Sequence, residues 1–576
     1  MLLDRFLSRT QFESYDDFYK NYSLNIPESF NFAFDVIDEL AKTKPNERAL
    51  VWCDEKGAEA TFTFSDMKKL SDQAANVFVE AGIKKGDSVM LILKRRYEYW
   101  PVLLALHKIG AAAIPATHLL TTKDIVYRCQ AADIAGIVCV DDAGVMFHID
   151  EAENKMKAEG KCPLRYKAFV RSVHTDKNLD IAGAAEKQIK TETPWNDFNA
   201  MAEKASSSFV RPAGNDAPKN DDIMLLYFTS GTTGMPKMVS HNFVYPLGHI
   251  LTARFWQNIQ EGGLHLTVAD TGWAKAAWGK IYGQWLSEGI VFVYDYDKFD
   301  PPAMLNIISK YKVNTFCAPP TIYRFFIKED LSTYDFSALR YCCVAGEPLN
   351  PEIYEQFKAA TGLKLMEGYG QTEMTVSLAT YPWMTPKPGS MGKPSPGYDI
   401  DVIREDGTSC DMGEEGQVIV RLDKRRPAGM FGGYYRDDAL TSKVFHDDAY
   451  FTGDMAWRDE DGFYWFVGRS DDVIKSSGYR IGPFEVESAL LEHPAVLECA
   501  ITGVPDPDRG TIVKATIILA KGYTASEELK KELQNHVKTT TAPYKYPRIV
   551  EFVTELPKTI SGKIRRVQIR EEDSGK

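Results

Sequence analysis

Between about residues 48 and 365, short apolar segments rich in β-branched residues alternate with longer segments whose apolar positions recur at helical spacing. Strands that alternate with helices in this way form parallel sheets covered by helices. The pattern therefore predicts an α/β domain with mainly parallel sheets. The clearest predicted strands are residues 88–93, 135–140, 290–294, 314–318 and 341–345.

A helix is predicted to follow Ser65, which has the short hydroxyl side chain of an N-cap. Asp66 comes next, and apolar residues then recur at helical spacing as far as Phe78. Residues 151–220, by contrast, are polar and weakly patterned. We expect this segment to be a peripheral excursion with a mobile loop at about residues 206–220.

The pattern changes after residues 468–472. Alternating strand patterns and one charged helix, at about residues 526–537, then indicate a compact α+β domain. The boundary is predicted near Asp471. It divides the chain into a large domain of residues 1–470 and a small domain of residues 471–576.

Composition excludes several classes of protein. The chain has 576 residues, of which 44% are hydrophobic and 26% charged, as in ordinary soluble globular proteins. Its net charge of -12 argues against a general binder of nucleic acid or of anionic membranes. An anionic substrate must therefore meet positive charge that is arranged locally.

Cysteine usage and the first residues suggest a location in the cell. The nine cysteines include no Cys-x-x-Cys pair, so a disulfide framework or structural zinc site is not expected. Residues 1–22 mix acidic and aromatic side chains, unlike a signal or transit peptide. No uninterrupted apolar run approaches membrane-spanning length. We therefore expect a reduced, cytoplasmic protein without a membrane span.

One loop, residues 227–237, follows an apolar run at residues 223–226 and has the composition of a phosphate cradle. Gly231 and Gly234 let the backbone approach an anion closely, and Lys237 adds a mobile positive charge. The glycines are too close together for a Walker A motif, and Met238 follows the lysine. The hydroxyl donors of the loop are Thr229, Ser230, Thr232 and Thr233.

The loop closely resembles the signature of the adenylate-forming superfamily, which contains acyl-CoA synthetases, peptide-synthetase adenylation domains and luciferases. Further motifs follow in the order found there, so the chain resembles acyl-CoA synthetases over nearly its whole length, most closely the medium-chain type. The resemblance implies the adenylate-forming enzyme fold, in which a mobile C-terminal domain carries the catalytic lysine. It also implies ATP, Mg²⁺ and coenzyme A as cofactors.

A segment at residues 367–373 carries the next motif. By resemblance, Tyr369 stacks on adenine, the Thr372 hydroxyl holds the α-phosphate, and Glu373 ligates Mg²⁺, a hard cation that prefers oxygen ligands. Thr372 and Glu373 are thus catalytic candidates. The other nucleotide contacts implied here are Glu367, Gly368, Gly370 and Gln371, together with Gly346, Glu347 and Pro348, which resemble the segment lining the adenine pocket.

Three later residues complete the implied adenylation site. Asp454 matches the acid that accepts hydrogen bonds from the ribose hydroxyls, and Arg469 matches the arginine that also reaches the ribose. By resemblance, Lys563 is the catalytic lysine, whose ammonium bridges the attacking carboxylate and the α-phosphate. Such a charge stabilises the meeting of two anions in the transition state.

A second set of residues in the small domain is implied to serve coenzyme A. Positions matching Ser477, Gly478 and Tyr479 border the path of the pantetheine thiol, and Arg480 matches a residue near the bound adenylate. Contacts to the coenzyme A nucleotide are implied for Arg509, Lys538 and Tyr546. Because this set and Lys563 serve different reactions, resemblance implies a small domain that pivots at a hinge near Asp471.

The acyl group should lie against residues 270–280, where bulky tryptophans stand beside small residues. Trp273 and Trp278 are the pocket candidates, with Trp278 as a floor that favours short, branched or compact acids. No acidic residue is placed to recognise an amino acid's ammonium group. Ordinary core packing remains an alternative for both tryptophans.

The leading hypothesis is an ATP-dependent carboxylic acid:coenzyme A ligase acting on a short branched or medium-chain fatty acid. It would form an acyl-adenylate, release pyrophosphate and pass the acyl group to the thiol. One alternative is an adenylation enzyme that loads a carrier protein. Another is a non-catalytic nucleotide-binding regulator, although Thr372, Glu373, Asp454, Arg469 and Lys563 are all present.

Overall fold

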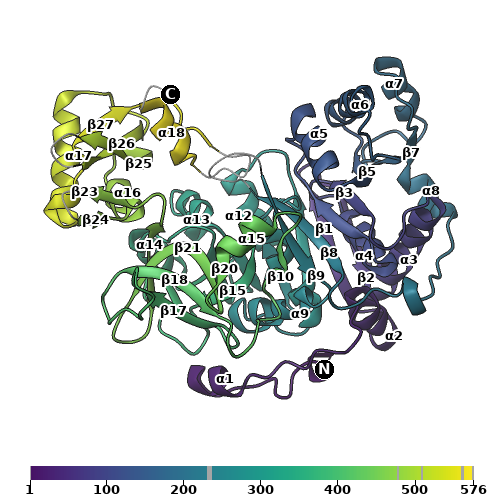
Figure 1. The fold of residues 1–576 in the computed structure, drawn as a ribbon, viewed down its shortest axis with the longest axis horizontal. Helices are drawn as coiled ribbons and strands as arrows, with labels where there is room; N and C mark the ends of the chain where they lie inside the picture. The colour runs from purple at the N-terminus through teal and green to yellow at the C-terminus, as the bar shows by residue number, and fades with distance from the viewer. Residues whose placement is uncertain (1, 230–235, 477–478, 507–509, 559–563, 574–576) are drawn as a thin grey trace.

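The computed structural model describes residues 2–229, 236–476, 479–506, 510–558 and 564–573. Two large sheets and their helices form most of the molecule, and the C-terminal elements gather at one end (Figure 1). The predicted α/β class with a smaller C-terminal domain is confirmed. Among the described residues, no helix combines the length and apolar character needed to cross a bilayer.

The first large sheet has eight strands in the order β19-β9-β8-β4-β3-β5-β6-β7. Pairing is parallel from β8 to β7 and antiparallel between β8, β9 and β19. The strands are β3 (Ser88–Ile92), β4 (Ala112–Pro115), β5 (Ile134–Val140), β6 (Tyr166–Val170), β7 (Trp195–Asp197), β8 (Ile223–Thr229), β9 (Lys237–Asn242) and β19 (Gly433–Tyr434). Its helices are α3 (Phe64–Glu80), α4 (Tyr99–Ile109), α5 (Thr122–Ala131), α6 (Ala143–Ala158), α7 (Ile181–Gln188) and α8 (Phe198–Lys204).

The second sheet is parallel in its middle and antiparallel at both ends. Its parallel strands are β1 (Arg48–Asp54), β10 (Leu264–Thr267), β11 (Ile290–Asp295), β12 (Thr315–Ala318), β13 (Tyr341–Ala345) and β14 (Leu365–Gln371). Antiparallel strands are β2 (Glu59–Thr63), β15 (Met374–Ala379), β16 (Ser390–Pro394), β17 (Asp399–Ile403), β18 (Gly416–Arg421), β20 (Phe445–His446), β21 (Ala449–Arg458) and β22 (Tyr464–Arg469). Further helices are α9 (Tyr245–Ile250), a π-helix (Leu251–Trp256), α10 (Lys275–Gly279), α11 (Tyr282–Leu286), α12 (Pro301–Lys310), α13 (Pro320–Phe326), α14 (Pro351–Thr361) and α15 (Asp438–Val444).

Two local expectations were wrong. The N-cap of α3 is Thr63 and not Ser65, because the Thr63 hydroxyl accepts from the Asp66 N–H while the Asp66 carboxylate accepts from the Thr63 N–H. Residues 151–220 are not an excursion, since they supply β6 and β7 at the edge of the first sheet. In the loop at residues 206–220, Arg211 forms an ion pair with Asp35 at 2.7 Å.

The C-terminal elements have a hydrophobic core of their own, centred on Val486, Ile501 and Leu533. A three-stranded sheet and a separate strand pair hold the helices around it. The elements are β23 (Ile474–Ser476), β24 (Tyr479–Ile481), α16 (Pro483–Leu491), β25 (Val496–Asp506), β26 (Gly510–Leu519), α17 (Glu527–Thr540), β27 (Ile549–Phe552) and α18 (Arg566–Asp573). Helix α17 matches the predicted charged helix, with Ser526 as its N-cap.

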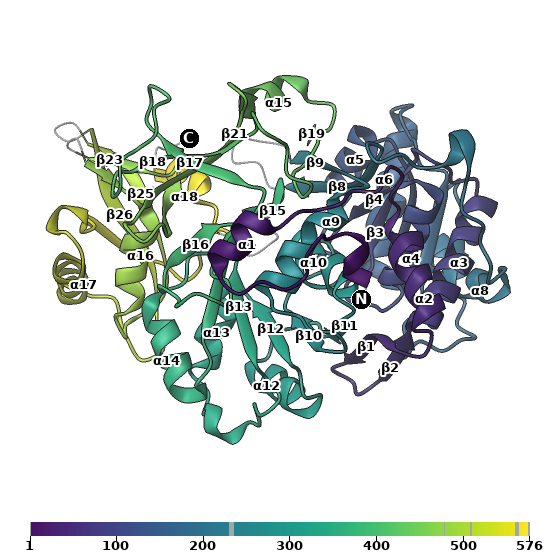
Figure 2. The same ribbon diagram turned by 90° about the horizontal axis from the view of Figure 1, so that it is seen from below.

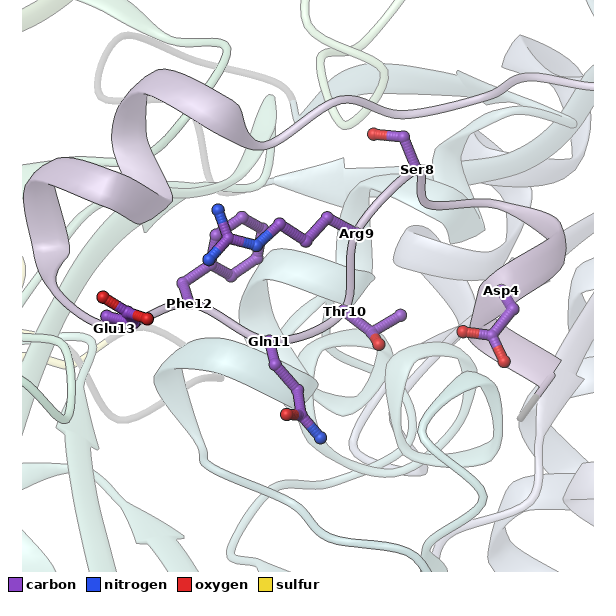
Figure 3. A pocket seen from close by; sticks show the side chains of 7 residues that line it. All are labelled: Asp4, Ser8, Arg9, Thr10, Gln11, Phe12 and Glu13. Atoms are coloured by element: carbon purple, nitrogen blue, oxygen red, sulfur yellow. The ribbon is translucent and has the colours of Figure 1, made fainter.

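The N-terminal segment lies across the second sheet, where α1 (Tyr15–Asn21) passes beside β16 (Figure 2). Phe18 of this segment packs on Phe255 of the π-helix, with ring centroids 4.5 Å apart, and the Tyr15 hydroxyl donates to the Pro394 carbonyl. An open cavity of about 530 Å³ belongs to this segment (Figure 3). Its lining residues are Asp4, Ser8, Arg9, Thr10, Gln11, Phe12 and Glu13, none of which is a predicted site residue.

Candidate active site

The turn between β14 and β15 presents Thr372 and Glu373, and neighbouring elements hold it from two sides. The Thr372 carbonyl oxygen lies 2.8 Å from Nε2 of His241 on β9. The Glu373 carbonyl accepts a hydrogen bond of 2.7 Å from the Phe431 N–H. Because both backbone carbonyls are held, the two side chains leave the turn from a fixed position.

Four predicted nucleotide contacts meet beside this turn, although they come from three strands. Asp454 on β21 and Arg469 on β22 are cross-strand partners, and the Arg469 Nε lies 3.4 Å from Asp454 Oδ1. Gln371 donates to Asp454 Oδ2 at 2.6 Å, and the Tyr369 hydroxyl donates to the same oxygen. A buried carboxylate thus gathers an arginine, an amide and a phenol.

The charges in this cluster stabilise one another. Burial opposes the charge of Arg469, but Asp454 and Asp471 outweigh it and raise the pKa of the guanidinium above its usual value. Burial, reinforced by the nearby Asp454 carboxylate, raises the pKa of Tyr369 well above its usual value. Tyr369 is therefore a neutral hydrogen-bond donor at physiological pH, while Asp454 is an acceptor.

The phosphate loop leaves β8 at Thr229 and returns to β9 at Lys237, and these two residues face each other across the hairpin. The positions between them that were predicted to bind phosphate are Ser230, Gly231, Thr232, Thr233 and Gly234, which lie outside the described residues. Lys237 places its Nζ 5.3 Å from the centre of the Tyr434 ring. The lysine is therefore close to the Glu373 turn, since the Tyr434 hydroxyl donates to Glu373 Oε1 at 2.9 Å.

Two glycines of β14 allow tryptophans to approach the strand. A Cβ atom at Gly368 would lie 2.5 Å from the Trp256 ring, and one at Gly370 would lie 2.4 Å from the Trp278 ring. The two indoles form an edge-to-face pair with centroids 6.2 Å apart. These glycines are thus required for packing, and they bring Trp278 against the strand that carries the nucleotide contacts.

The predicted acyl segment begins at an ion pair and ends at a buried amine. Asp270 pairs with Arg95 at 3.3 Å, and the partly exposed Trp273 lies just before α10. Trp278 on α10 is 7% exposed. Burial, with a further contribution from the Arg95 guanidinium, lowers the pKa of Lys280 to about 7. The segment therefore offers an apolar wall with a weakly basic amine behind it.

The adenine segment follows β13, where Gly346 has a φ of +111° that favours glycine. Glu347 accepts a hydrogen bond from Thr321 at 3.1 Å, and Pro348 precedes a loop whose Leu349 N–H points to the Glu367 carboxylate at 3.4 Å. The same carboxylate accepts from the Gly389 N–H at 2.8 Å. Burial raises the pKa of Glu367 well above its usual value. Glu367 is thus placed to hold the adenine segment.

The predicted coenzyme A residues are only partly described. Ser477, Gly478 and Arg509, together with the catalytic candidate Lys563, lie outside the described residues. Tyr479 is 51% exposed and stacks on Tyr544 at 4.1 Å. Lys538 lies over the ring of Tyr546 at 4.1 Å, so these two predicted contacts are adjacent.

Two further residues lie where the domains meet. Arg480 pairs with Glu405, in the hairpin between β17 and β18, at 2.8 Å. Arg480 was predicted near the adenylate, and no contact between it and the Asp454 cluster occurs among the described residues. The predicted hinge residue, Asp471, lies 3.9 Å from Arg469, whereas Asp472 pairs with Arg570 of α18.

Sequence reasoning assigned no role to Tyr434, His241, Trp256 or Tyr450, all of which contact predicted site residues. The Tyr450 hydroxyl donates to Gln371 Oε1 at 2.8 Å. Tyr450 lies only four residues before Asp454 in the sequence, which was a usable signal. Neither Tyr434 nor Trp256 lies in a recognised motif, because each acts through packing across distant strands.

Comparisons with known proteins agree with this geometry. Residues 37–435 match the AMP-binding enzyme family, and residues 485–563 match the AMP-binding enzyme C-terminal domain. Acyl-coenzyme A synthetase ACSM3, mitochondrial, of Rattus norvegicus is 40% identical over 98% of this chain and 94% of the relative. Acyl-coenzyme A synthetase ACSM5, mitochondrial, of Homo sapiens is 42% identical over 96% of this chain and 92% of the relative.

Solved structures with the same fold include two ligases. The anthranilate CoA ligase AuaEII, in complex with anthranoyl-AMP, has a TM-score of 0.81 at 27% identity and covers 95% of this chain and 98% of its own. An acyl-CoA synthetase of Brucella canis has a TM-score of 0.70 at 30% identity and covers 98% of this chain and 99% of its own.

These relatives correct one expectation. The predicted cytoplasmic location is contradicted, because the similar curated acyl-coenzyme A synthetases are mitochondrial enzymes. The reduced state inferred from the cysteines does not separate the two compartments. The ligase hypothesis, by contrast, is confirmed. The chain belongs to the AMP-binding enzyme family as an acyl-coenzyme A synthetase of the medium-chain type, an ATP-dependent, AMP-forming acid–thiol ligase that works through an acyl-adenylate.

Proposed function

We propose that this ligase activates a short branched or medium-chain fatty acid in a nucleotide site built around Asp454, with Mg²⁺ on the phosphates. In the first step a carboxylate oxygen of the acid attacks the α-phosphorus of ATP, and pyrophosphate leaves. In the second step the coenzyme A thiol, losing its proton, attacks the acyl carbonyl, and AMP leaves. Neither step needs a nucleophile from the protein.

The observation that carries the proposal is the meeting of Tyr369, Gln371 and Arg469 at the Asp454 carboxylate. A carboxylate is the acceptor that a ribose diol needs, and charge-assisted hydrogen bonds are about twice as strong as neutral ones. When ATP binds, we expect the ribose hydroxyls to replace part of this internal network. The turn at Thr372 would then face the α-phosphate.

Mg²⁺ fits the residues of this turn. Glu373 offers a carboxylate, which is a hard oxygen donor. No group of three or more acidic, histidine or cysteine side chains suited to a metal occurs among the described residues. That agrees with Mg²⁺, which is usually held by one or two carboxylates together with substrate phosphates. Bound there, the ion would neutralise phosphate charge.

The acyl preference is proposed from Trp278. Its ring lies against Gly370, one residue before Gln371, so the apolar wall is next to the nucleotide site. A bulky, buried indole at that position shortens the space for an alkyl chain. Compact or branched acids of up to medium length are therefore the proposed substrates.

The two half-reactions are proposed to use different orientations of the small domain, with residues 471–576 turning about Asp471. Support comes from the neighbouring acids, since Asp471 faces Arg469 of the large domain while Asp472 is bound by Arg570 and Arg566 of the small one. Lys563 would act in the first step, and the segment around Gly478 in the second. A mitochondrial location is proposed from the names of the relatives.

The test is pyrophosphate release by the purified protein with Mg-ATP and coenzyme A, together with mass detection of the thioester. The panel of acids runs from acetate and 2-methylbutyrate to octanoate and benzoate. A compact or medium-chain optimum with acyl-CoA as product supports the proposal. An optimum at benzoate would refute the acyl assignment.

A further inference from the structure

Tyr434 contacts both loops that are expected to handle the ATP phosphates. Its hydroxyl donates a hydrogen bond of 2.9 Å to Glu373 Oε1, on the turn after β14. The centre of its ring lies 5.3 Å from the Nζ of Lys237, where the phosphate loop rejoins β9. One side chain therefore joins the proposed metal ligand to the phosphate-loop lysine.

The backbone fixes Tyr434 in this position. Strand β19 pairs with β9, so that Tyr434 lies opposite Val239, only two residues after Lys237. The Tyr434 N–H donates to the Thr441 hydroxyl at 2.9 Å, and its ring packs on Phe431, whose N–H holds the Glu373 carbonyl. Tyr434 is only 6% exposed. Its hydroxyl therefore has little freedom to leave Glu373.

We propose that Tyr434 is a positioning residue for the metal–nucleotide complex: its hydroxyl sets the Glu373 carboxylate for the cation, and its ring sets the Lys237 ammonium for the phosphates. The inference rests on the proposed function, which makes Glu373 the metal ligand. A hydrogen bond to one carboxylate oxygen fixes the side-chain rotamer and leaves the other oxygen outside that bond. Such supporting partners typically change metal affinity or activity by about 10- to 100-fold.

The ring has a separate task. A cation over an aromatic face is attracted by the negative potential of that face. Within the described residues, no carboxylate lies within ion-pair distance of the Lys237 ammonium, so the ring holds the lysine without neutralising it. Its full charge then remains for phosphate. Removing the hydroxyl and removing the ring should consequently have different effects.

The test measures metal binding directly, by electron paramagnetic resonance of Mn²⁺ titrated into the full-length protein with a non-hydrolysable ATP analogue. Tyr434→Phe keeps the ring and removes the hydroxyl, and we expect Mn²⁺ affinity to fall about 10-fold or more. The matched control is Tyr464→Phe, because the buried Tyr464 hydroxyl donates to the Ile400 carbonyl at 3.1 Å and not to a carboxylate. The control should bind Mn²⁺ like the unmodified protein.

Glu373→Gln separates this inference from the proposed function. If Glu373→Gln weakens Mn²⁺ binding and Tyr434→Phe does not, the role of Tyr434 is refuted while the metal ligand stands. If Glu373→Gln binds Mn²⁺ normally, the metal assignment itself fails. The double variant should bind Mn²⁺ no more weakly than Glu373→Gln alone, since Tyr434 acts through Glu373. Additive losses of Mn²⁺ affinity would overturn that coupling.

Tyr434→Leu tests the ring. We expect Tyr434→Leu to lower the affinity of the protein for the metal-free ATP analogue by about 2- to 5-fold. Tyr434→Phe should leave that affinity unchanged. Isothermal titration in the presence of a chelator measures both values. Equal affinities for the two variants would refute the role of the ring toward Lys237.

Discussion

Gly370 and the Trp278 ring are so close that the strand and the indole exclude any side chain between them. A Cβ atom at Gly370 would lie 2.4 Å from the ring and 2.6 Å from the Thr375 carbonyl oxygen. Because one neighbour is backbone, the crowding cannot be relieved by a rotamer change. The shape of the acyl wall and the course of β14 are therefore set together.

Gly370→Ala should consequently destabilise the protein by about 1–3 kcal/mol through overpacking, and lower kcat/KM for every acid. Thermal unfolding and pyrophosphate release measure the two effects. Gly136→Ala on β5 is the matched control, because a Cβ atom there would meet the Tyr166 ring at an ordinary 3.4 Å. Equal stability of the two variants would contradict the close contact.

Trp278→Leu should lengthen the acyl space. We expect kcat/KM for octanoate to rise relative to that for 2-methylbutyrate by about 10-fold, since each methylene in an apolar pocket changes discrimination by about 1–3 kcal/mol. The control is Trp457→Leu. Trp457 lies on β21, away from α10, and stacks on Trp465. An unchanged order of acids in Trp278→Leu would mean that this indole is core packing only.

Asp454→Asn should weaken ATP binding without changing the acyl preference. Hydrogen bonds to a charged group contribute about 1.5–3 kcal/mol, so KM for ATP should rise about 10- to 100-fold. Asp401→Asn is a fair control. Asp401 also forms an ion pair with an arginine on the adjacent strand of the same sheet, Arg421. A normal KM for ATP in Asp454→Asn would remove the ribose assignment.

Lys563→Ala should lose adenylation far more than thioester formation. Its ammonium is proposed to act only where the carboxylate meets the α-phosphate, and removing such a group costs several kcal/mol of barrier. Pyrophosphate release measures the first step, and acyl-CoA formation from supplied acyl-adenylate measures the second. Equal losses in both steps would contradict a small domain that serves them in turn.

Lys280 should make stability depend on pH. Between pH about 7 and the ordinary lysine value of 10.5, the unfolded chain keeps a proton on this amine that the folded chain has lost. The unfolded state then binds more protons, so the contribution of Lys280 to the free energy of unfolding rises with pH, on the order of 4 kcal/mol across that window. Below pH about 7, the buried charge of the Lys280 ammonium destabilises the fold.

Lys280→Met should therefore raise the thermal midpoint more at pH 6 than at pH 10, relative to the unmodified protein. The exposed Lys187 offers the control, Lys187→Met, for which no such difference is expected. A pH-independent effect of Lys280→Met would show that the amine keeps an ordinary pKa.

The sequence allowed much of the fold to be predicted, because buried parallel strands such as β5 and β11 are continuous apolar runs. Tyr369 and Asp454 could be assigned to one nucleotide site by resemblance to the family, but their direct hydrogen bond is visible only in the structure. Tyr434 could not be found this way, since its role depends on the pairing of β19 with β9, almost 200 residues earlier in the chain. The cap at Thr63 was missed because Ser65 has equivalent chemistry two residues later.

The separate core of the C-terminal elements limits what a reorientation would expose. Its members, from Ile474 to Val550, share no residue with the cores of the large sheets. The contacts that cross the junction include two polar ones, Asn350 with the Ser488 carbonyl and Arg480 with Glu405, and one aromatic pair, Phe466 with Phe484, whose ring centroids are 5.3 Å apart. An exposed ion pair such as Arg480–Glu405 contributes about 0–1 kcal/mol. Turning the small domain would therefore break these surface contacts and the Phe466–Phe484 pair, but would leave the core around Val486, Ile501 and Leu533 packed.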